Sequence, residues 1–127
     1  ILSVKLQFLD EENEERRRIA HRYREEINNR KIELPFVIHE ESHVWHLFVI
    51  RSKERAALER HMTKQGIQTL IHYPIPPHKQ PAYQQWNGEF YLITEEIHDT
   101  VLSLPLYPGM PEEHVAQVIE ACNTFEN

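Results

Sequence analysis

The first thirty residues carry apolar side chains at a helical period. The spacings are three, four and seven, and the stripe consists of Leu2, Leu6, Leu9, Ile19, Ala20, Tyr23 and Ile27. Residues 10–18 between its two ends are almost all charged, and Glu14 with Arg18 is spaced for a helical ion pair. This pattern predicts one long helix from residue 2 to about residue 30. The charged middle of the helix is expected to lie outside the core, where it forms either a solvated face or a docking face. Such a helix would connect two parts of a larger protein.

The next seventy residues change to the pattern of a small α/β unit. Residues 44–50 are apolar on both faces, which is typical of a strand covered on both sides. A helix is expected over residues 53–65, with Ser52 as its N-cap and Gly66 in a left-handed conformation after its end. Residues 67–73 are apolar at alternate positions and form the next predicted strand. If the two strands are parallel, their connection should be right-handed.

The C-terminal part is expected to contain shorter elements. Residues 80–86 suit a short helix or turn, and Thr94 could cap a helix that carries Ile93, Ile97 and Val101 on one side. Residues 102–104 form a short strand that Pro105 ends, and Pro111 opens the last helix, where proline is tolerated. The inward face of that helix consists of Val115, Val118, Ile119 and Cys122.

These elements define the expected fold class and its division. The class is α/β, more strictly α+β: a small sheet covered by helices and preceded by a long helix. We divide the chain into a long helical region, residues 1–33, and an α/β domain, residues 34–127. The chain opens directly in helical periodicity, without an initiator methionine or an N-cap, so we expect a fragment of a longer protein.

Composition excludes several classes of function. The chain has 127 residues and a formal net charge of −6, which disfavours binding to nucleic acids and to anionic membranes. Its single cysteine, Cys122, permits no disulfide within the chain, which indicates a reducing compartment, the cytoplasm. No apolar run approaches the length of a membrane span, and the N-terminus has no signal-peptide pattern.

The familiar catalytic constellations are not expected either. The nine histidines do not form a zinc-binding pattern, and His43 and His46 would point to opposite faces of a strand. Cys122 is better explained as a small core residue than as a nucleophile. The three glycines are too far apart for a phosphate-binding loop. We therefore predict no metal site and no nucleophilic triad.

The segment from Thr69 to His78 is the best candidate for function. Three prolines in four residues end strand pairing after Tyr73, so His72, Tyr73 and His78 are held on stiff backbone beyond a strand end. Two interpretations remain open from the residues alone: a polar binding rim, or a stiff crossover whose histidines only fill space. The aromatic residues that could offer a flat face to a sugar or nucleotide are Trp45, Tyr73, Tyr83, Trp86 and Tyr107, although core packing is favoured for Trp45.

Several stretches resemble the C-terminal small domain of nucleotide-sugar aminotransferases of the DegT/DnrJ/StrS type. These stretches are HVWHLFVIR at 43–51, GIQT at 66–69, IHYPIPPHKQ at 71–80, AY at 82–83 and LSLPL at 102–106, and residues 2–23 resemble the interdomain helix of the family. The family consists of pyridoxal-phosphate enzymes with the aspartate-aminotransferase-like fold. Within it, residues 71–80 and 94–98 are most similar to enzymes that aminate a dTDP-linked 3-keto-6-deoxyhexose at C3.

The resemblance implies a reaction for the parent protein. An amino group would pass from glutamate to the keto sugar through pyridoxamine phosphate, in the biosynthesis of sugars for surface polysaccharides such as lipopolysaccharide. The cofactor would supply the electron-sink chemistry and the protein the orientation. The parent enzyme is expected to be a cytoplasmic homodimer that binds the nucleotide sugar and glutamate.

The same resemblance places the Schiff-base lysine and the phosphate-binding residues in a large N-terminal domain outside this chain. We therefore expect no catalytic residue and no bound pyridoxal phosphate in this fragment, which should be inactive alone. None of the lysines sits in the family's lysine motif; they are Lys5, Lys31, Lys53, Lys64 and Lys79.

The resemblance assigns His72, Tyr73 and His78 to substrate binding, at the mouth of the active site near the sugar. Neutral imidazole and phenol groups can donate hydrogen bonds to sugar hydroxyls without burying a charge. One departure from the family is Met110-Pro111, where a hydroxyl residue more often caps the last helix. The alternative hypothesis is a non-catalytic binding or assembly module that shares this domain.

Overall fold

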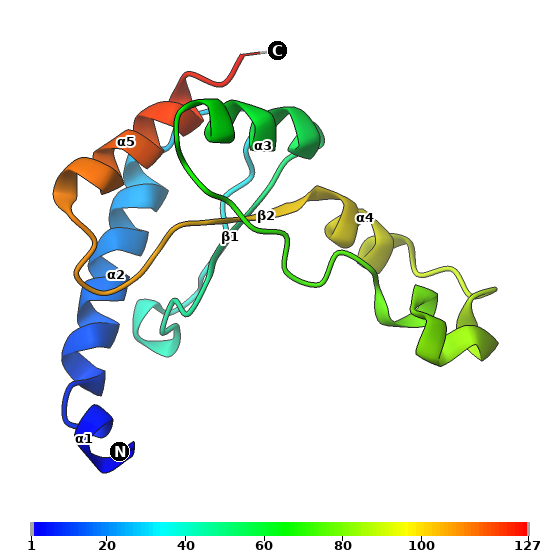
Figure 1. Ribbon diagram of the computed structural model, residues 1–127, viewed down its shortest axis with the longest axis horizontal. Coiled ribbons are helices and arrows are strands. Elements are labelled where there is room, and N and C mark those ends of the chain that lie inside the picture. The colour runs from blue at the N-terminus through cyan, green and yellow to red at the C-terminus, as the bar shows by residue number, and fades with distance from the viewer. Residues whose placement is uncertain (1, 127) are drawn as a thin grey trace.

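The computed structural model describes residues 2–126, and the side chain of Leu2, the first member of the expected stripe, lies outside the described part. Two short strands cross the centre, with helices gathered at one side and a long excursion at the other (Figure 1). In chain order the elements are α1 (Leu2–Leu6), α2 (Leu9–Glu26), η1 (Glu40–Ser42), β1 (Phe48–Arg51), α3 (Arg55–Lys64), η2 (Pro77–Lys79), η3 (Pro81–Trp86), α4 (Leu92–Thr100), β2 (Val101–Leu104) and α5 (Glu112–Asn123). None of the helices described in residues 2–126 is long and apolar enough to cross a membrane.

The expected long helix is divided and ends early. A break at residues 7–8 separates α1 from α2, and α2 stops at Glu26 instead of near residue 30. It stops because the next residues bind α5: the backbone N–H of Asn28 donates to Asn123 Oδ1 at 2.7 Å. The expected pair of Glu14 and Arg18 is wrong, since Arg18 pairs with Glu112 across the gap to α5.

The sheet is smaller than predicted. β1 pairs with β2 in antiparallel register, from Phe48 opposite Leu104 to Arg51 opposite Val101. The strand expected over 44–50 starts only at Phe48, because Trp45 takes a left-handed backbone with φ 49° and turns its indole into the core. The strand expected over 67–73 is also wrong, so the right-handed connection considered for parallel strands does not arise. That segment makes one antiparallel bridge, Leu70 to Ser103.

The helix ends show which local signals were reliable. Gly66 follows α3 with φ +75°, as expected for a left-handed C-terminal residue. The prediction of Ser52 as N-cap is wrong, because α3 begins at Arg55 and Glu54 occupies the N-cap position. The Ser52 Oγ instead accepts the backbone N–H of Glu54 at 3.2 Å. Thr94 lies inside α4 and does not cap it. Pro111 stands directly before α5, in agreement with the prediction.

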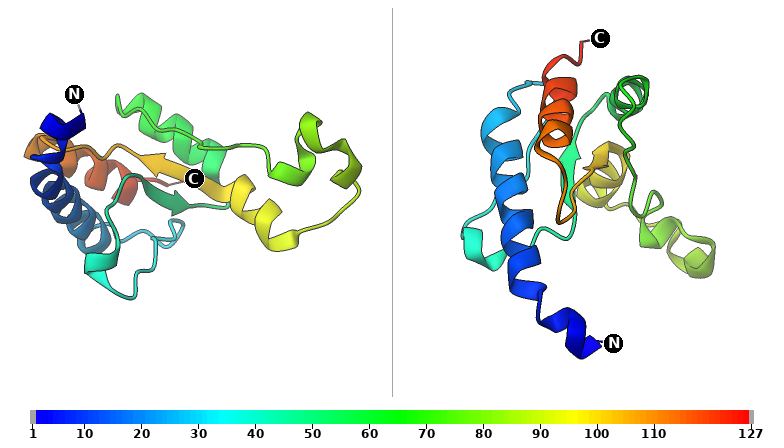
Figure 2. Two further views of the ribbon diagram at one scale, coloured as in Figure 1. Left: turned by 90° about the horizontal axis from the view of Figure 1, so that it is seen from below. Right: turned by 60° about the vertical axis from the view of Figure 1, so that its left-hand side comes forward.

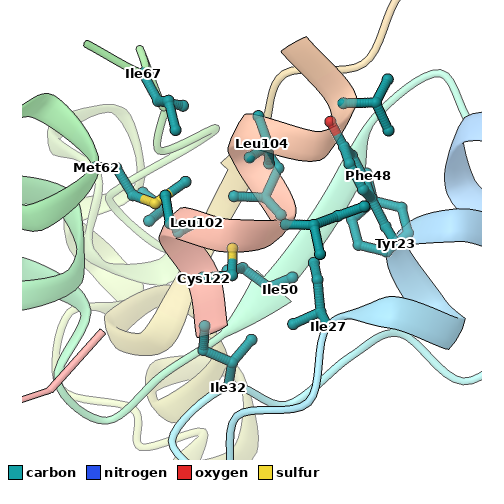
Figure 3. Packing of buried hydrophobic residues seen from close by; sticks show 14 of the residues in the cluster. Tyr23, Ile27, Ile32, Phe48, Ile50, Met62, Ile67, Leu102, Leu104 and Cys122 are labelled. Carbon is teal, nitrogen blue, oxygen red and sulfur yellow. The ribbon is translucent and has the colours of Figure 1, made fainter. Parts of the chain in front are cut away.

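The core lies where α2, α3 and α5 meet the two strands (Figure 3). Tyr23 is fully buried with its ring edge against Phe48, and its hydroxyl donates to the Pro105 carbonyl at 2.8 Å. The inward face predicted for α5 is confirmed, including Cys122, which is fully buried. Burial raises the pKa of the Cys122 thiol to about 12, so this side chain serves the core as a small neutral group.

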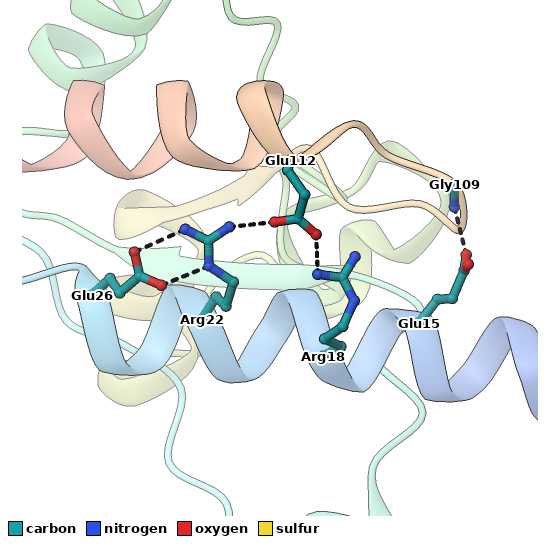
Figure 4. A network of polar contacts seen from close by, with 6 residues as sticks. All are labelled: Glu15, Arg18, Arg22, Glu26, Gly109 and Glu112. Atoms are coloured by element: carbon teal, nitrogen blue, oxygen red, sulfur yellow. Dashed lines mark hydrogen bonds and ion pairs between the residues drawn. The ribbon is translucent and has the colours of Figure 1, made fainter.

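A polar network joins α2 to the start of α5 at the edge of this core (Figure 4). Glu112 in the first turn of α5 binds both Arg18 and Arg22, and the Arg22 guanidinium also holds Glu26 at 2.6 Å. The backbone N–H of Gly109, just before α5, donates to Glu15 Oε2 at 2.6 Å. These contacts fix the angle between two helices that enclose the core.

Candidate functional site

A hollow of about 280 Å³ lies where the chain leaves the sheet after the Leu70–Ser103 bridge. It combines an apolar wall with imidazole, phenol and hydroxyl groups. Its lining consists of Leu47, Val49, His72, Tyr73, Ile97, His98, Val101 and Ser103. We call this space the first hollow. An apolar cavity with a few convergent polar groups is the usual form of a small-molecule site.

His72 is held against the sheet. Its Nδ1 lies 2.8 Å from the Oγ of Ser103, and Ser103 is itself buried on β2. Ser103 also exchanges both backbone hydrogen bonds with Leu70, at 2.8 and 3.2 Å. The imidazole is therefore fixed by one ring nitrogen to a rigid strand, which leaves Nε2 as the ring atom that can meet a ligand.

Tyr73 occupies an unusual backbone conformation. Its φ is 55°, in the left-handed region that non-glycine residues seldom adopt, at a cost of about 1–3 kcal/mol. The conformation turns the chain sharply before Pro74, and the side chain is 78% exposed. Backbone strain of this kind is concentrated at functional sites, where it aims a side chain at a ligand.

The His72-Tyr73 pair stands between three neighbouring hollows. A second hollow of about 510 Å³ shares His72, Ser103 and Leu47 with the first, and it extends along residues 66–70 toward α5. A third, of about 490 Å³, shares Tyr73 with the first and extends along residues 74–82. One pair of adjacent side chains thus borders three neighbouring hollows.

His78 is placed differently from the other two predicted residues. Only 5% of its surface is exposed; its Nε2 lies 2.8 Å from Glu95 Oε1, and its ring packs edge-on against Tyr91. The hydrogen bond to His78, followed by that from the Tyr91 backbone N–H, lowers the pKa of the Glu95 carboxyl. The structure therefore brings His72 and Tyr73 together at the first hollow, whereas His78 supports the segment beyond it.

Ser103 and His98 were missed as site residues by the sequence argument. Ser103 is 31 residues from His72 in sequence and meets it only through the bridge to β2. The available signal was a polar residue at the centre of a short apolar strand, which is expected to need a buried partner. His98 lies on α4, where its Nδ1 is 2.8 Å from the Thr94 carbonyl.

Pyridoxal phosphate, the cofactor implied by the resemblance, needs a lysine amine and an acid for its ring nitrogen. The lining of the first hollow offers neither group. Lys79 lies nearby in sequence, but its Nζ donates to the carbonyls of Asn87 and Glu89 at 2.9 and 3.0 Å. These residues by themselves do not fit the cofactor.

A separate hollow of about 300 Å³ is lined by charged residues near the end of β1. Two of its four cations are paired: Arg51 contacts Glu96 at 2.8 Å and Glu33 at 3.6 Å, and Lys31 contacts Glu54 at 3.2 Å. The other two are Arg30 and Lys53, and the three glutamates of the lining leave little net charge for an anion. We therefore place the candidate site at the first hollow.

Comparison with known sequences identifies the family of the chain. A family model described as the DegT/DnrJ/EryC1/StrS aminotransferase family matches residues 1–123. The dTDP-3-amino-3,6-dideoxy-alpha-D-galactopyranose transaminase of Aneurinibacillus thermoaerophilus is 54% identical over 98% of this chain and 34% of its own length. The erythromycin biosynthesis sensory transduction protein EryC1 of Saccharopolyspora erythraea is 39% identical over 94% of this chain and 33% of its own length.

Solved structures show the same fold. The crystal structure of S. venezuelae DesV in complex with a ketimine intermediate superposes with a TM-score of 0.87 at 33% identity, covering 96% of this chain and 34% of DesV. NtdA from Bacillus subtilis with bound cofactor PMP gives a TM-score of 0.73 at 38% identity, covering 87% of this chain and 27% of NtdA. The chain spans about a third of the length of the relatives that it matches.

Proposed function

The chain belongs to the DegT/DnrJ/EryC1/StrS aminotransferase family, and we propose that it is the small C-terminal domain of a longer pyridoxal-phosphate enzyme. That enzyme transfers an amino group from glutamate to C3 of a dTDP-linked keto-6-deoxyhexose, as a homodimer in the cytoplasm. The observation that carries the proposal is the 54% identity, over 98% of the chain, to a relative named as a dTDP-3-amino-3,6-dideoxy-alpha-D-galactopyranose transaminase. Residues 1–33 would join this domain to the large domain.

The first hollow would receive the hexose. His72 Nε2 and the Tyr73 hydroxyl can exchange hydrogen bonds with sugar hydroxyls, and neither group carries a formal charge that the ligand must desolvate. Ser103 acts as a positioning residue, because its hydroxyl holds the imidazole of His72 at 2.8 Å. The apolar wall, which includes Val49 and Ile97, excludes water from the bound ring.

The cofactor, when bound, supplies the electron sink for the amino transfer. The family resemblance assigns its lysine to the part of the parent enzyme outside these residues, and the lining of the first hollow contains no lysine. The role proposed for this chain is to bind and orient the sugar. His78 supports the segment that follows Tyr73, and we do not place it on the substrate.

The test separates the two half-reactions of the intact parent enzyme. Replacing His72 by alanine should slow amination of the keto sugar by roughly tenfold or more, the effect of losing one strong hydrogen bond to a ligand. The glutamate half-reaction, followed by the loss of pyridoxal absorbance, should change much less. Tyr73→Phe, which keeps the ring and removes only the hydroxyl, should show the same selectivity.

Two control variants test whether the effect of His72→Ala comes from the imidazole at the first hollow. His21 is an exposed histidine on α2, away from the hollow, so His21→Ala should leave both half-reactions unchanged. Ser103→Ala should reproduce part of the His72→Ala defect, since it releases the imidazole without removing it. Equal losses in both half-reactions would contradict substrate binding at His72. An intact protein without any amino transfer would favour the non-catalytic module.

A further inference from the structure

Residues 71–99 form an arm that has no apolar core of its own. The arm leaves the body after the Leu70–Ser103 bridge and returns to it at Thr100 (Figures 1 and 2). Within the arm, His78 is the only residue classed as buried. A folded segment normally buries apolar side chains to offset its loss of conformational entropy, so the arm must be stabilised in another way.

A polar cluster holds the arm together from inside. His78 binds Glu95 at 2.8 Å, which ties η2 to α4. Lys79 donates to the carbonyls of Asn87 and Glu89, which ties η2 to the loop before α4. Contacts of this kind contribute little net stability in partly exposed sites, because water competes for each group.

Large apolar side chains of the arm are exposed, although the Tyr91 ring packs edge-on against His78 and Lys79 lies over the Phe90 ring. Phe90, Tyr91, Leu92 and Ile93 are consecutive, and they are 77%, 51%, 78% and 76% exposed. A run of four exposed apolar residues is not expected on a free surface and marks a contact with another surface. Because two of the four are aliphatic, the run suits a protein surface better than a planar ring such as a nucleobase.

The relatives indicate what covers this run. The superposition on DesV covers 96% of this chain and 34% of DesV. The uncovered 4% of this chain is too small to contain the arm. The arm therefore follows the same course in a protein whose remaining two thirds are absent here. That additional polypeptide is the surface most directly available to cover the apolar run.

We propose that the run Phe90–Ile93 docks on the large domain of the parent enzyme and that this contact orders the arm. The inference rests on the proposed function only in assuming that such a domain exists. Docking has a consequence for the site, because α4 begins at Leu92 and carries Ile97 and His98 to the wall of the first hollow. The contact would set the position of that wall.

Hydrogen–deuterium exchange tests the docking without relying on activity. Amides of residues 86–97 should exchange at least roughly tenfold more slowly in the intact parent enzyme than in the 127-residue chain. The double variant Leu92→Asp/Ile93→Asp should remove this protection in the intact enzyme. Aspartate in the first turn of a helix is favourable, so the variant does not weaken α4 itself.

The matched control adds the same charge elsewhere on the arm. Gln84 and Gln85 are exposed on η3, and Gln84→Asp/Gln85→Asp should keep the protection. Equal exchange in the chain and the intact enzyme would overturn the inference. Protection that appears in the isolated chain and rises with its concentration would also overturn it, in favour of a second copy. Protection in an enzyme without amino transfer would leave the docking correct and the proposed function wrong.

Discussion

Two asparagines lock the ends of α2 and α5 to each other, and their removal gives the sharpest stability prediction. Asn29 Nδ2 donates to the carbonyls of Cys122 and Phe125 at 2.8 and 3.0 Å, at the C-terminal end of α5. Its Oδ1 accepts the backbone N–H of Lys31 at 2.9 Å. In return, Asn123 Nδ2 donates to the Glu26 carbonyl, the last residue of α2, at 2.9 Å.

The expected magnitude follows from counting these bonds. Asn29→Ala removes three hydrogen bonds, each worth about 0.5–1.5 kcal/mol net, so the free energy of unfolding should fall by about 2–3 kcal/mol once partial rehydration is allowed. Asn29→Asp should be at least as harmful. It keeps the acceptor for Lys31 but directs a carboxylate oxygen at two carbonyls, and it places a negative charge at the end of a helix.

The assay is urea unfolding of the 127-residue chain, followed by far-ultraviolet circular dichroism. The midpoint should shift while the slope with denaturant stays constant, as expected for a change in stability alone. Asn28→Ala is the matched control, because the contact of Asn28 with Asn123 uses its backbone N–H and survives the substitution. Its expected effect is below about 0.5 kcal/mol. Similar losses for Asn28→Ala and Asn29→Ala would refute the reciprocal lock.

Three further predictions use other contacts. The lowered pKa of Glu95 means that its contact with His78 stabilises the arm above the ordinary carboxyl pKa of 4.5 and loses that effect as pH falls through the lower folded value. The protection factors of the arm amides, which compare each rate with the intrinsic exchange rate at the same pH, should therefore fall at acid pH in the wild type but not in Glu95→Gln. Cys122, buried and with a raised pKa, should react with a thiol reagent at pH 8 only at the rate of unfolding, and fast labelling without denaturant would contradict its burial. Arg22→Ala should cost below about 1 kcal/mol in urea unfolding and less at high salt, because its pair with Glu112 is partly exposed.

The elements that sequence could predict are those fixed by local chemistry. The last helix has its proline before the first turn and its apolar face at regular spacing, and the structure confirms both. Gly66 was likewise identified from its place after a helix. The arguments failed where a distant residue decides. Asn123 ends α2 through Asn28, 95 residues away in sequence, and nothing in the local pattern of α2 indicates this contact.

The predicted strand over residues 67–73 failed for a different reason. Alternating apolar positions identify an extended chain that packs on a core, and they do not show whether a neighbouring strand pairs with it. Here Ile67 is buried, yet only Leu70 pairs with the sheet. The same limit affected the site. Proline chemistry placed His72 and Tyr73 on stiff backbone, but Ser103, the partner that fixes His72, lies 31 residues later in the sequence on β2.

The two ends of the arm, where it joins the sheet, are held more firmly than its middle. This difference gives the two ends and the middle different roles at the site. At the outgoing end, His72 is bound to Ser103 on the sheet. At the returning end, Arg51 Nε donates to Thr100 Oγ1 at 3.1 Å, and Arg55 Nη1 donates to the His98 carbonyl at 2.5 Å. Docking of the run Phe90–Ile93 can therefore tilt α4 about its C-terminal end, at Thr100, while His72 stays bound to Ser103 on β2. The imidazole would define where the sugar binds, and the docked arm would define how tightly the hollow closes around it.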